Sequence, residues 1–233
     1  MNQAALHKLV SNRLNVKDPE ALFDLRLSTN LSLIQQLFFS LYPVEKHGRD
    51  FDKLLKLLPK LYALRPDELQ RQDMERVQTE SWYQSEDIVG MQLYVENFNN
   101  DLKGLHEKIS YFKDLGVNFI HVMPITTRPK GESDGGYAVN SYLKVDKKYG
   151  SQEDLLKLTS AFRQHGILLM LDFVVNHTSD EYPWAKKAKK GEQKYLDYYY
   201  TFKDRTVPDA FEKVLPEVFP ETSPGNFTFV PEM

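Results

Sequence analysis

The 233-residue sequence contains no cysteine, which excludes a disulfide framework and a cysteine-ligated metal site. It has no basic excess, because its formal net charge is −3, and this argues against a nucleic-acid-binding surface. The basic run at residues 186–190 is interpreted as a solvated helix face. The first ten residues lack a signal-peptide core, and no stretch approaches the roughly 18 apolar residues of a membrane helix. We therefore expect a cytoplasmic protein with no nucleic-acid or membrane partner.

Several motifs of enzyme chemistry are also absent. The sequence has no GxGxxG and no GxxxxGK[ST], which argues against nucleotide binding through these motifs. It has no HExxH and no GxSxG, which argues against zinc proteolysis and α/β-hydrolase chemistry.

The first part of the chain, residues 1–87, has the pattern of a helical domain. Apolar residues recur at helical spacing in two runs, at residues 22–41 and 51–62. Pro43 and Pro66 follow these runs, and proline is a common helix terminator. Clusters of β-branched residues are almost lacking, so we expect a small helical bundle and no strands.

The next part, residues 88–177, alternates between strands and helices. Two helices are expected, one beginning after Asp101 and ending at Gly116, the other beginning after Ser151 and ending at Gly166. This order predicts a parallel sheet with right-handed crossovers. The last two strands are nearly continuous apolar runs, which predicts burial on both faces. A barrel and a doubly wound fold both satisfy the pattern, whose expected strands are residues 88–95, 117–123 and 167–175.

Polar residues follow two of these strands, where parallel α/β folds carry their sites. After the second strand, two glycines allow a tight turn that could hold Asp134 and Tyr137 toward a pocket. In the third, alternation puts Asp172 and Asn176 on one face, and a buried carboxylate needs a cationic partner or a functional site. His177 could donate to a ligand oxygen. A surface turn, a buried Asp–Arg pair and a packed histidine remain the plain alternatives.

These motifs resemble a known family. The run DFVVNH at residues 172–177 resembles the first signature region of the α-amylase superfamily, glycoside hydrolase family 13. The match is similar to amylosucrases in particular, and it continues through SDGGYAV at residues 133–139, DLKGL at 101–105 and FFSLY at 38–42.

The resemblance implies an α/β fold in which a helical N-terminal domain precedes a (β/α)8 TIM barrel. Residues 1–87 would form the helical domain and residues 88–177 the first three β/α units of the barrel. Residues 178–233 would begin the insertion called domain B, in which the chain would be truncated.

The resemblance also implies an activity. Amylosucrases split sucrose with retention and pass the glucosyl unit to an α-1,4-glucan. By this analogy Asp134 closes the bottom of the glucosyl pocket, Tyr137 stacks on the ring and His177 hydrogen-bonds a hydroxyl. Asp172 and Asn176 would shape the site. No metal and no cofactor are implied, and the partners would be sucrose and α-glucan.

The family places its nucleophile after strand four and its acid/base after strand five. We therefore expect this chain to lack the catalytic residues and not to cleave sucrose by itself. We also expect possible self-association through an unpaired strand edge. The sequence carries Glu96 where this group has Asp, and no role is assigned to it. Two alternatives stay open: another family 13 α-glucosidase or α-amylase-type hydrolase, and a non-catalytic carbohydrate-binding fragment.

Overall fold

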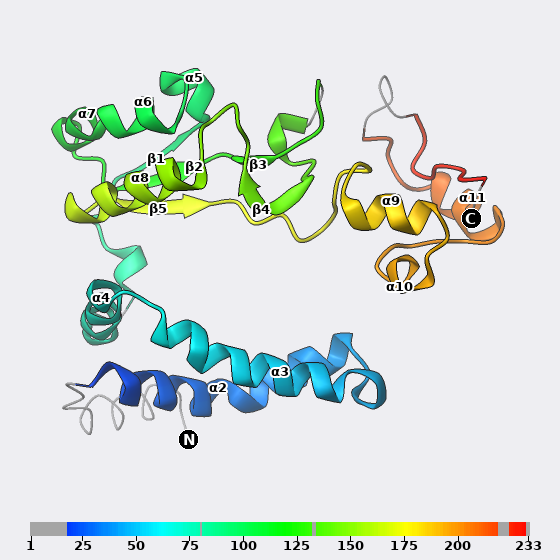
Figure 1. Ribbon diagram of the computed structural model, residues 1–233, viewed down its shortest axis with the longest axis horizontal. Helices are drawn as coiled ribbons and strands as arrows, with labels where there is room; N and C mark the ends of the chain where they lie inside the picture. The colour runs from blue at the N-terminus through cyan, green and yellow to red at the C-terminus, as the bar shows by residue number, and fades with distance from the viewer. Residues whose placement is uncertain (1–17, 80, 132–133, 219–223, 232–233) are drawn as a thin grey trace. The chain divides into compact units, whose positions relative to one another are not determined.

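A computed structural model describes residues 18–79, 81–131, 134–218 and 224–231 (Figure 1). The chain divides into two compact units, with the boundary between Ser85 and Glu86. The division into three domains at residues 87 and 177 stays a prediction.

The first unit is helical, as the sequence predicts. Asp18 caps α2, the first helix among the described residues, by accepting a hydrogen bond from the Glu20 amide. The first two helices run alongside each other (Figure 1) and join through aromatic rings, with Phe38 and Phe51 centroids 5.2 Å apart. Phe23 stacks on Tyr62 at 4.5 Å. The elements are α2 (Pro19–Leu41), α3 (Val44–Ala63), α4 (Asp67–Gln78) and the 3-10 turn η1 (Trp82–Gln84).

The second unit contains a parallel sheet in the order β1-β2-β5, which confirms the predicted strand–helix–strand arrangement. The register aligns Gly90 with Phe119, and Phe119 with Leu168. Each strand has four residues and is shorter than expected. The strands are β1 (Gly90–Leu93), β2 (Phe119–Val122) and β5 (Leu168–Leu171).

The prediction that the first and third strands continue to residues 95 and 175 is wrong. The first strand gives way to the helix α5 (Val95–Asn99), whose N-cap is Tyr94. The third strand ends at Leu171 because it lies at the sheet edge: within the described residues it pairs with β2 alone, and β2 ends at Val122. Residues 172–177 therefore have no ladder partner there.

The crossover helices begin and end where the sequence predicts. The Asp101 carboxylate accepts from the Gly104 amide, and Ser151 forms a capping box with Asp154. Gly116 and Gly166 adopt φ of 73° and 72°, the left-handed conformation expected after a helix. The first helix is broken at Lys108, so the elements are α6 (Leu102–Glu107), α7 (Ile109–Asp114) and α8 (Gln152–Gln164).

The core of this unit lies between these helices and the sheet (Figure 1). Phe112 and Phe162 are fully buried and meet edge to face at 6.2 Å, with Ile120 of β2 also fully buried. On β5, however, Met170 and Leu171 are 43% and 39% exposed, so the expected burial of this strand on both faces is wrong. An edge strand with one neighbour has less protein around it than a central strand.

The segment between β2 and α8 is structured rather than a plain loop. It contains the 3-10 turn η2 (Asp134–Gly136) and an antiparallel pair of strands, β3 (Thr126–Thr127) and β4 (Ser141–Val145). This segment carries the glycine turn to the carboxyl ends of β2 and β5.

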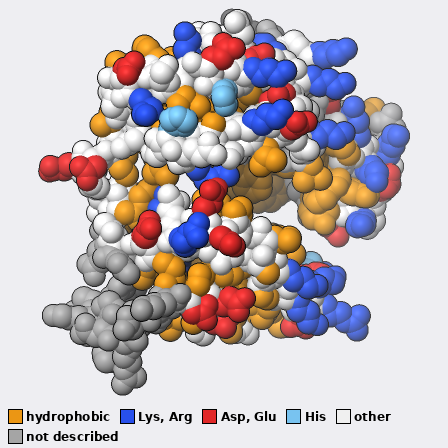
Figure 2. All heavy atoms as spheres, turned by 60° about the vertical axis from the view of Figure 1, so that its left-hand side comes forward, with side chains coloured by type: hydrophobic (Ala, Val, Ile, Leu, Met, Phe, Trp, Pro, Cys, Tyr) orange, Lys and Arg blue, Asp and Glu red, His pale blue; other side chains and the backbone are white. Residues whose placement is uncertain are grey.

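The part after β5 contains helices α9 (Pro183–Lys189), α10 (Gln193–Leu196) and α11 (Thr206–Glu212). In α9 the basic run faces solvent while Ala185 and Ala188 are buried, which confirms the solvated helix face. Lys and Arg side chains lie beside Asp and Glu side chains on the face that Figure 2 shows.

In the described part of the chain, no helix has the length and apolar character needed to cross a membrane.

Candidate functional site

The centre of the candidate site is a contact between Tyr137 and Asp172. Tyr137 follows the turn η2, and Asp172 follows the last residue of β5. The Tyr137 phenol donates a hydrogen bond of 3.1 Å to Oδ2 of Asp172. The structure thus brings together two of the residues that the sequence singles out.

The other oxygen of this carboxylate faces a histidine. Nε2 of His121 in β2 lies 3.2 Å from Oδ1 of Asp172, and both side chains are about one-fifth exposed, at 18% and 20%. Their geometry is poor for a hydrogen bond, and this buried nitrogen has no hydrogen-bond partner among the described residues. Asp172 therefore has a tyrosine and a histidine beside it, and not the arginine of the alternative interpretation.

Sequence reasoning missed His121, although a signal was present. It is the polar side chain within the otherwise apolar strand FIHV. A polar residue inside a buried strand needs a partner, and Asp172 follows the neighbouring strand. Two polar residues on adjacent parallel strands are candidates for one pair.

Burial, followed by the hydrogen bond to Asp172, raises the pKa of Tyr137 above its ordinary value. The negative charges of Asp172 and Asp134 act in the same direction. The phenol is therefore protonated at neutral pH and serves as a donor to Asp172.

The turn before Tyr137 has the backbone that its glycines predict. Gly135 and Gly136 have φ of 61° and 98°, and Asp134 also has a positive φ of 49°. A side-chain carbon added at Gly136 would lie 3.2 Å from the Pro124 carbonyl oxygen, so the chain passes close to this carbonyl. The Asp134 carbonyl accepts from the Tyr137 amide at 3.0 Å, which closes the turn. Asp134 itself is exposed, and no hydrogen bond joins its carboxylate to the other residues the structure describes.

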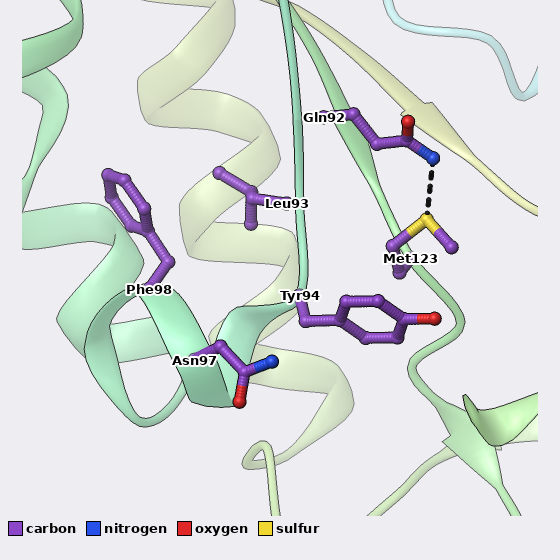
Figure 3. Close-up of a pocket in the computed structure, with 6 residues that line it drawn as sticks. All are labelled: Gln92, Leu93, Tyr94, Asn97, Phe98 and Met123. Atoms are coloured by element: carbon purple, nitrogen blue, oxygen red, sulfur yellow. Dashed lines mark hydrogen bonds between the residues drawn. The ribbon is translucent and has the colours of Figure 1, made fainter.

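A hollow of about 430 Å³ lies beside this pair, at the carboxyl end of β1 (Figure 3). Met123 connects the hollow with the Tyr137–Asp172 pair. Its sulfur lies 3.9 Å from the Tyr137 hydroxyl and accepts a hydrogen bond from the Gln92 side-chain amide. The Tyr94 hydroxyl approaches the turn, since a carbon added at Gly135 would lie 2.9 Å from it. The lining residues were not singled out from the sequence; they are Gln92, Leu93, Tyr94, Asn97, Phe98 and Met123.

Asn176 and His177 make contacts with other residues than Tyr137 and Asp172 do. Both are exposed, and Asn176 Nδ2 is 3.3 Å from His177 Nδ1. The His177 carbonyl accepts from the Tyr142 hydroxyl at 3.2 Å. Across the described ranges, no hydrogen bond or ion pair joins either side chain to Tyr137 or Asp172. Their roles at a sugar, and that of Asp134, stay predictions.

Metal ligands were not expected here. Among the described residues, no group of three His, Asp or Glu side chains could hold a metal ion. The expectation of a site without metal or cofactor stays a prediction.

Comparison with known proteins finds relatives over about half of the chain. An oligo-1,6-glucosidase from Heyndrickxia coagulans is 35% identical over 130 residues, covering 52% of this chain and 22% of that protein. A 4-alpha-glucanotransferase from Thermotoga neapolitana is 35% identical over 129 residues, covering 52% and 28%. A crystal structure of a mutant of MutB, a trehalulose synthase, in complex with glucose is 35% identical over 49% of this chain and 22% of that chain, with a TM-score of 0.45. The chain thus spans about a quarter of the curated relatives' length.

A family model described as "Alpha amylase, catalytic domain" matches residues 56–223. The match extends over most of the chain and includes the glycine turn, Asp172 and His177. The chain therefore belongs to the α-amylase catalytic-domain family.

Proposed function

We propose that this chain forms the glucosyl-binding corner of an amylosucrase-type enzyme that acts on sucrose and α-1,4-glucans. The observation that supports this proposal is the hydrogen bond from Tyr137 to Asp172, at the carboxyl ends of neighbouring parallel strands. Ligand sites of parallel α/β proteins lie at these ends. The strands β1, β2 and β5 would then be the first three of a (β/α)8 barrel.

The chemistry of the pair suits a sugar ring. The carboxylate of Asp172 accepts from the phenol and so fixes the direction of the Tyr137 ring. An oriented aromatic face can stack on the apolar face of a pyranose, while a carboxylate such as Asp134 can accept from hydroxyls. The polar atoms of Gln92, Tyr94 and Asn97 around the neighbouring hollow add further donors and acceptors.

Binding is the first test of the proposal. Isothermal titration calorimetry of the purified chain with glucose, sucrose and maltotriose should give a Kd in about the millimolar range, as a partial pocket allows. Tyr137→Ala should abolish the heat of binding. Tyr200→Ala is the matched control, because that tyrosine is 96% exposed and outside the site. An unchanged titration of Tyr137→Ala, or no binding by the wild type, would contradict the proposal.

Cleavage is the second test. Retaining glycosyl transfer uses two carboxyl groups about 5–5.5 Å apart, one as nucleophile and one as acid/base. The Asp172 carboxylate near Tyr137 already accepts a hydrogen bond from the Tyr137 phenol and faces His121. This arrangement suits a residue that orients Tyr137 better than one that attacks the sugar as a nucleophile. We propose that the nucleophile and the acid/base lie outside this chain. Incubation with sucrose should therefore release no fructose above a heat-treated control.

A second candidate is an α-glucosidase of the same family. It is favoured by the names of the matched relatives, which include an oligo-1,6-glucosidase and a glucanotransferase. The amylosucrase proposal rests on the resemblance of the sequence motifs, including those of the helical domain, to amylosucrases. Comparing the affinities for sucrose and isomaltose in the same titration discriminates between the two candidates.

A further inference from the structure

Glu96 lies in the first turn of α5, shortly after β1, and its carboxylate lies close to the cationic side chains of Arg128 and Lys148. Its Oε2 accepts hydrogen bonds from Lys148 Nζ at 2.6 Å and from Arg128 Nη2 at 3.4 Å. The Glu96 side chain is 25% exposed and that of Arg128 is 14% exposed. This is the position where the sequence departs from the Asp of amylosucrases, and the longer side chain makes both contacts.

Arg128 also lies close to the glycine turn. A side-chain carbon added at Gly136 would lie 3.5 Å from its Nη1, so the guanidinium occupies the space beside this glycine. One nitrogen of the guanidinium thus faces Glu96 in the first turn of α5, and the other lies beside the turn that precedes Tyr137. The planar guanidinium carries its N–H donors on separate nitrogens in a rigid fork, so two of its nitrogens can face two different groups.

The surroundings keep Glu96 charged. The hydrogen bond from Lys148 is the largest effect lowering its pKa, and a hydrogen bond with Tyr149 and the charges of Lys148 and Arg128 lower it further. Tyr149 is 2% exposed, and the Arg128 guanidinium lies 5.5 Å from its ring centroid. Without the carboxylate, two cations would face each other with no anion between them.

We propose that Glu96 is a positioning residue for the glycine turn: its carboxylate holds the Arg128 guanidinium against Gly136 and thereby fixes the turn that presents Tyr137. The benefit to sugar binding rests on the proposed function, whereas the coupling between Glu96 and the turn does not. Lys148 binds the same carboxylate from a more exposed position, 52% exposed, and is not among the nearest atoms to either turn glycine. It therefore provides a matched control.

Hydrogen–deuterium exchange of the turn tests the coupling directly. The Tyr137 amide donates to the Asp134 carbonyl and reports on the closed turn. We expect Glu96→Gln and Arg128→Met each to speed its exchange about two- to fivefold, the size expected when a partly buried ion pair is lost. The double variant should exchange no faster than either single variant, because both remove one coupling. Lys148→Met should leave the exchange rate unchanged.

The same variants are titrated with glucose. Affinity should fall in Glu96→Gln and Arg128→Met and stay unchanged in Lys148→Met. Equal effects of Lys148→Met and Arg128→Met, additive effects in the double variant, or unchanged exchange would each overturn the proposal. If a variant lacks the wild-type circular dichroism signal, Glu96→Asp replaces it and should give an intermediate exchange rate. If the wild type binds no glucose, the proposed function is contradicted. The exchange rates still show whether Glu96 is coupled to the glycine turn.

Discussion

The Tyr137 hydroxyl lies 3.1 Å from the Asp172 carboxylate, although 35 positions separate the two residues in the chain. The bond connects the glycine turn after β2 with the end of β5. Because β2 and β5 are adjacent and parallel, their carboxyl ends meet at one edge of the sheet. The contact therefore depends on the sheet order as well as on the two motifs.

Removing the phenol hydroxyl tests the contribution of this bond to stability. Tyr137→Phe should lower the free energy of unfolding by about 1 kcal/mol, since a partly buried hydrogen bond to a charged group is lost while the ring stays. Urea unfolding followed by circular dichroism measures the change. Tyr200→Phe is the control, and an equal loss in both variants would count against the assigned bond.

The ion cluster around Glu96 predicts a dependence on pH. The folded-state pKa of Glu96 lies below its ordinary value of 4.5, mainly through the Lys148 hydrogen bond. Stability from the ionised carboxylate is therefore fully present above pH 4.5 and is lost as the pH falls through the folded-state pKa. Glu96→Gln should lower stability at pH 7 by about 1 kcal/mol and reduce the loss on acidification below pH 4.5. Parallel stability curves for the two proteins between pH 7 and pH 3 would refute this expectation.

The glycine turn predicts a specific cost of substitution. Gly136→Ala should destabilise the protein by about 1–3 kcal/mol, because a φ of 98° is unfavourable for alanine and the new carbon lies 3.2 Å from the Pro124 oxygen. Gly131→Ala is the control, since Gly131 has a φ of 87° but no heavy atom within 4 Å of the added carbon. The difference between the two midpoints of thermal unfolding isolates the close contact. A smaller effect at Gly136 than at Gly131 would show that the turn can relax.

The edge of the sheet predicts self-association. β5 carries the partly exposed Met170 and Leu171, and among the residues the structure describes it pairs with β2 alone. An apolar strand edge without a partner is a template for another chain. Size-exclusion chromatography with light scattering should show a mass that rises with concentration. Leu171→Lys should shift the population toward monomer, whereas Leu143→Lys, at an 80% exposed site of β4, should not. A monomer at every concentration would contradict this prediction.

Local signals in the sequence predicted most of the fold. The capping box at Ser151, the left-handed glycines Gly116 and Gly166 and the apolar stripes between them act over a few residues, so they could be read directly. Strand lengths could not be read in this way, because a strand ends where its neighbour stops offering hydrogen bonds. Residues after Leu171 have strand-like composition but lack a ladder partner among the described residues.

The candidate site divides along the same line. The sequence alone determined that Asp134, Tyr137, Asp172 and His177 are the candidate site residues, because a charge in an apolar strand needs a partner or a site and paired glycines allow a tight turn. Only the tertiary structure decided that Tyr137 meets Asp172, that His121 faces the same carboxylate and that the His177 carbonyl accepts a hydrogen bond from Tyr142. The physical reason is that motifs act locally, whereas side-chain partners are set by which strands lie side by side and where each one stops.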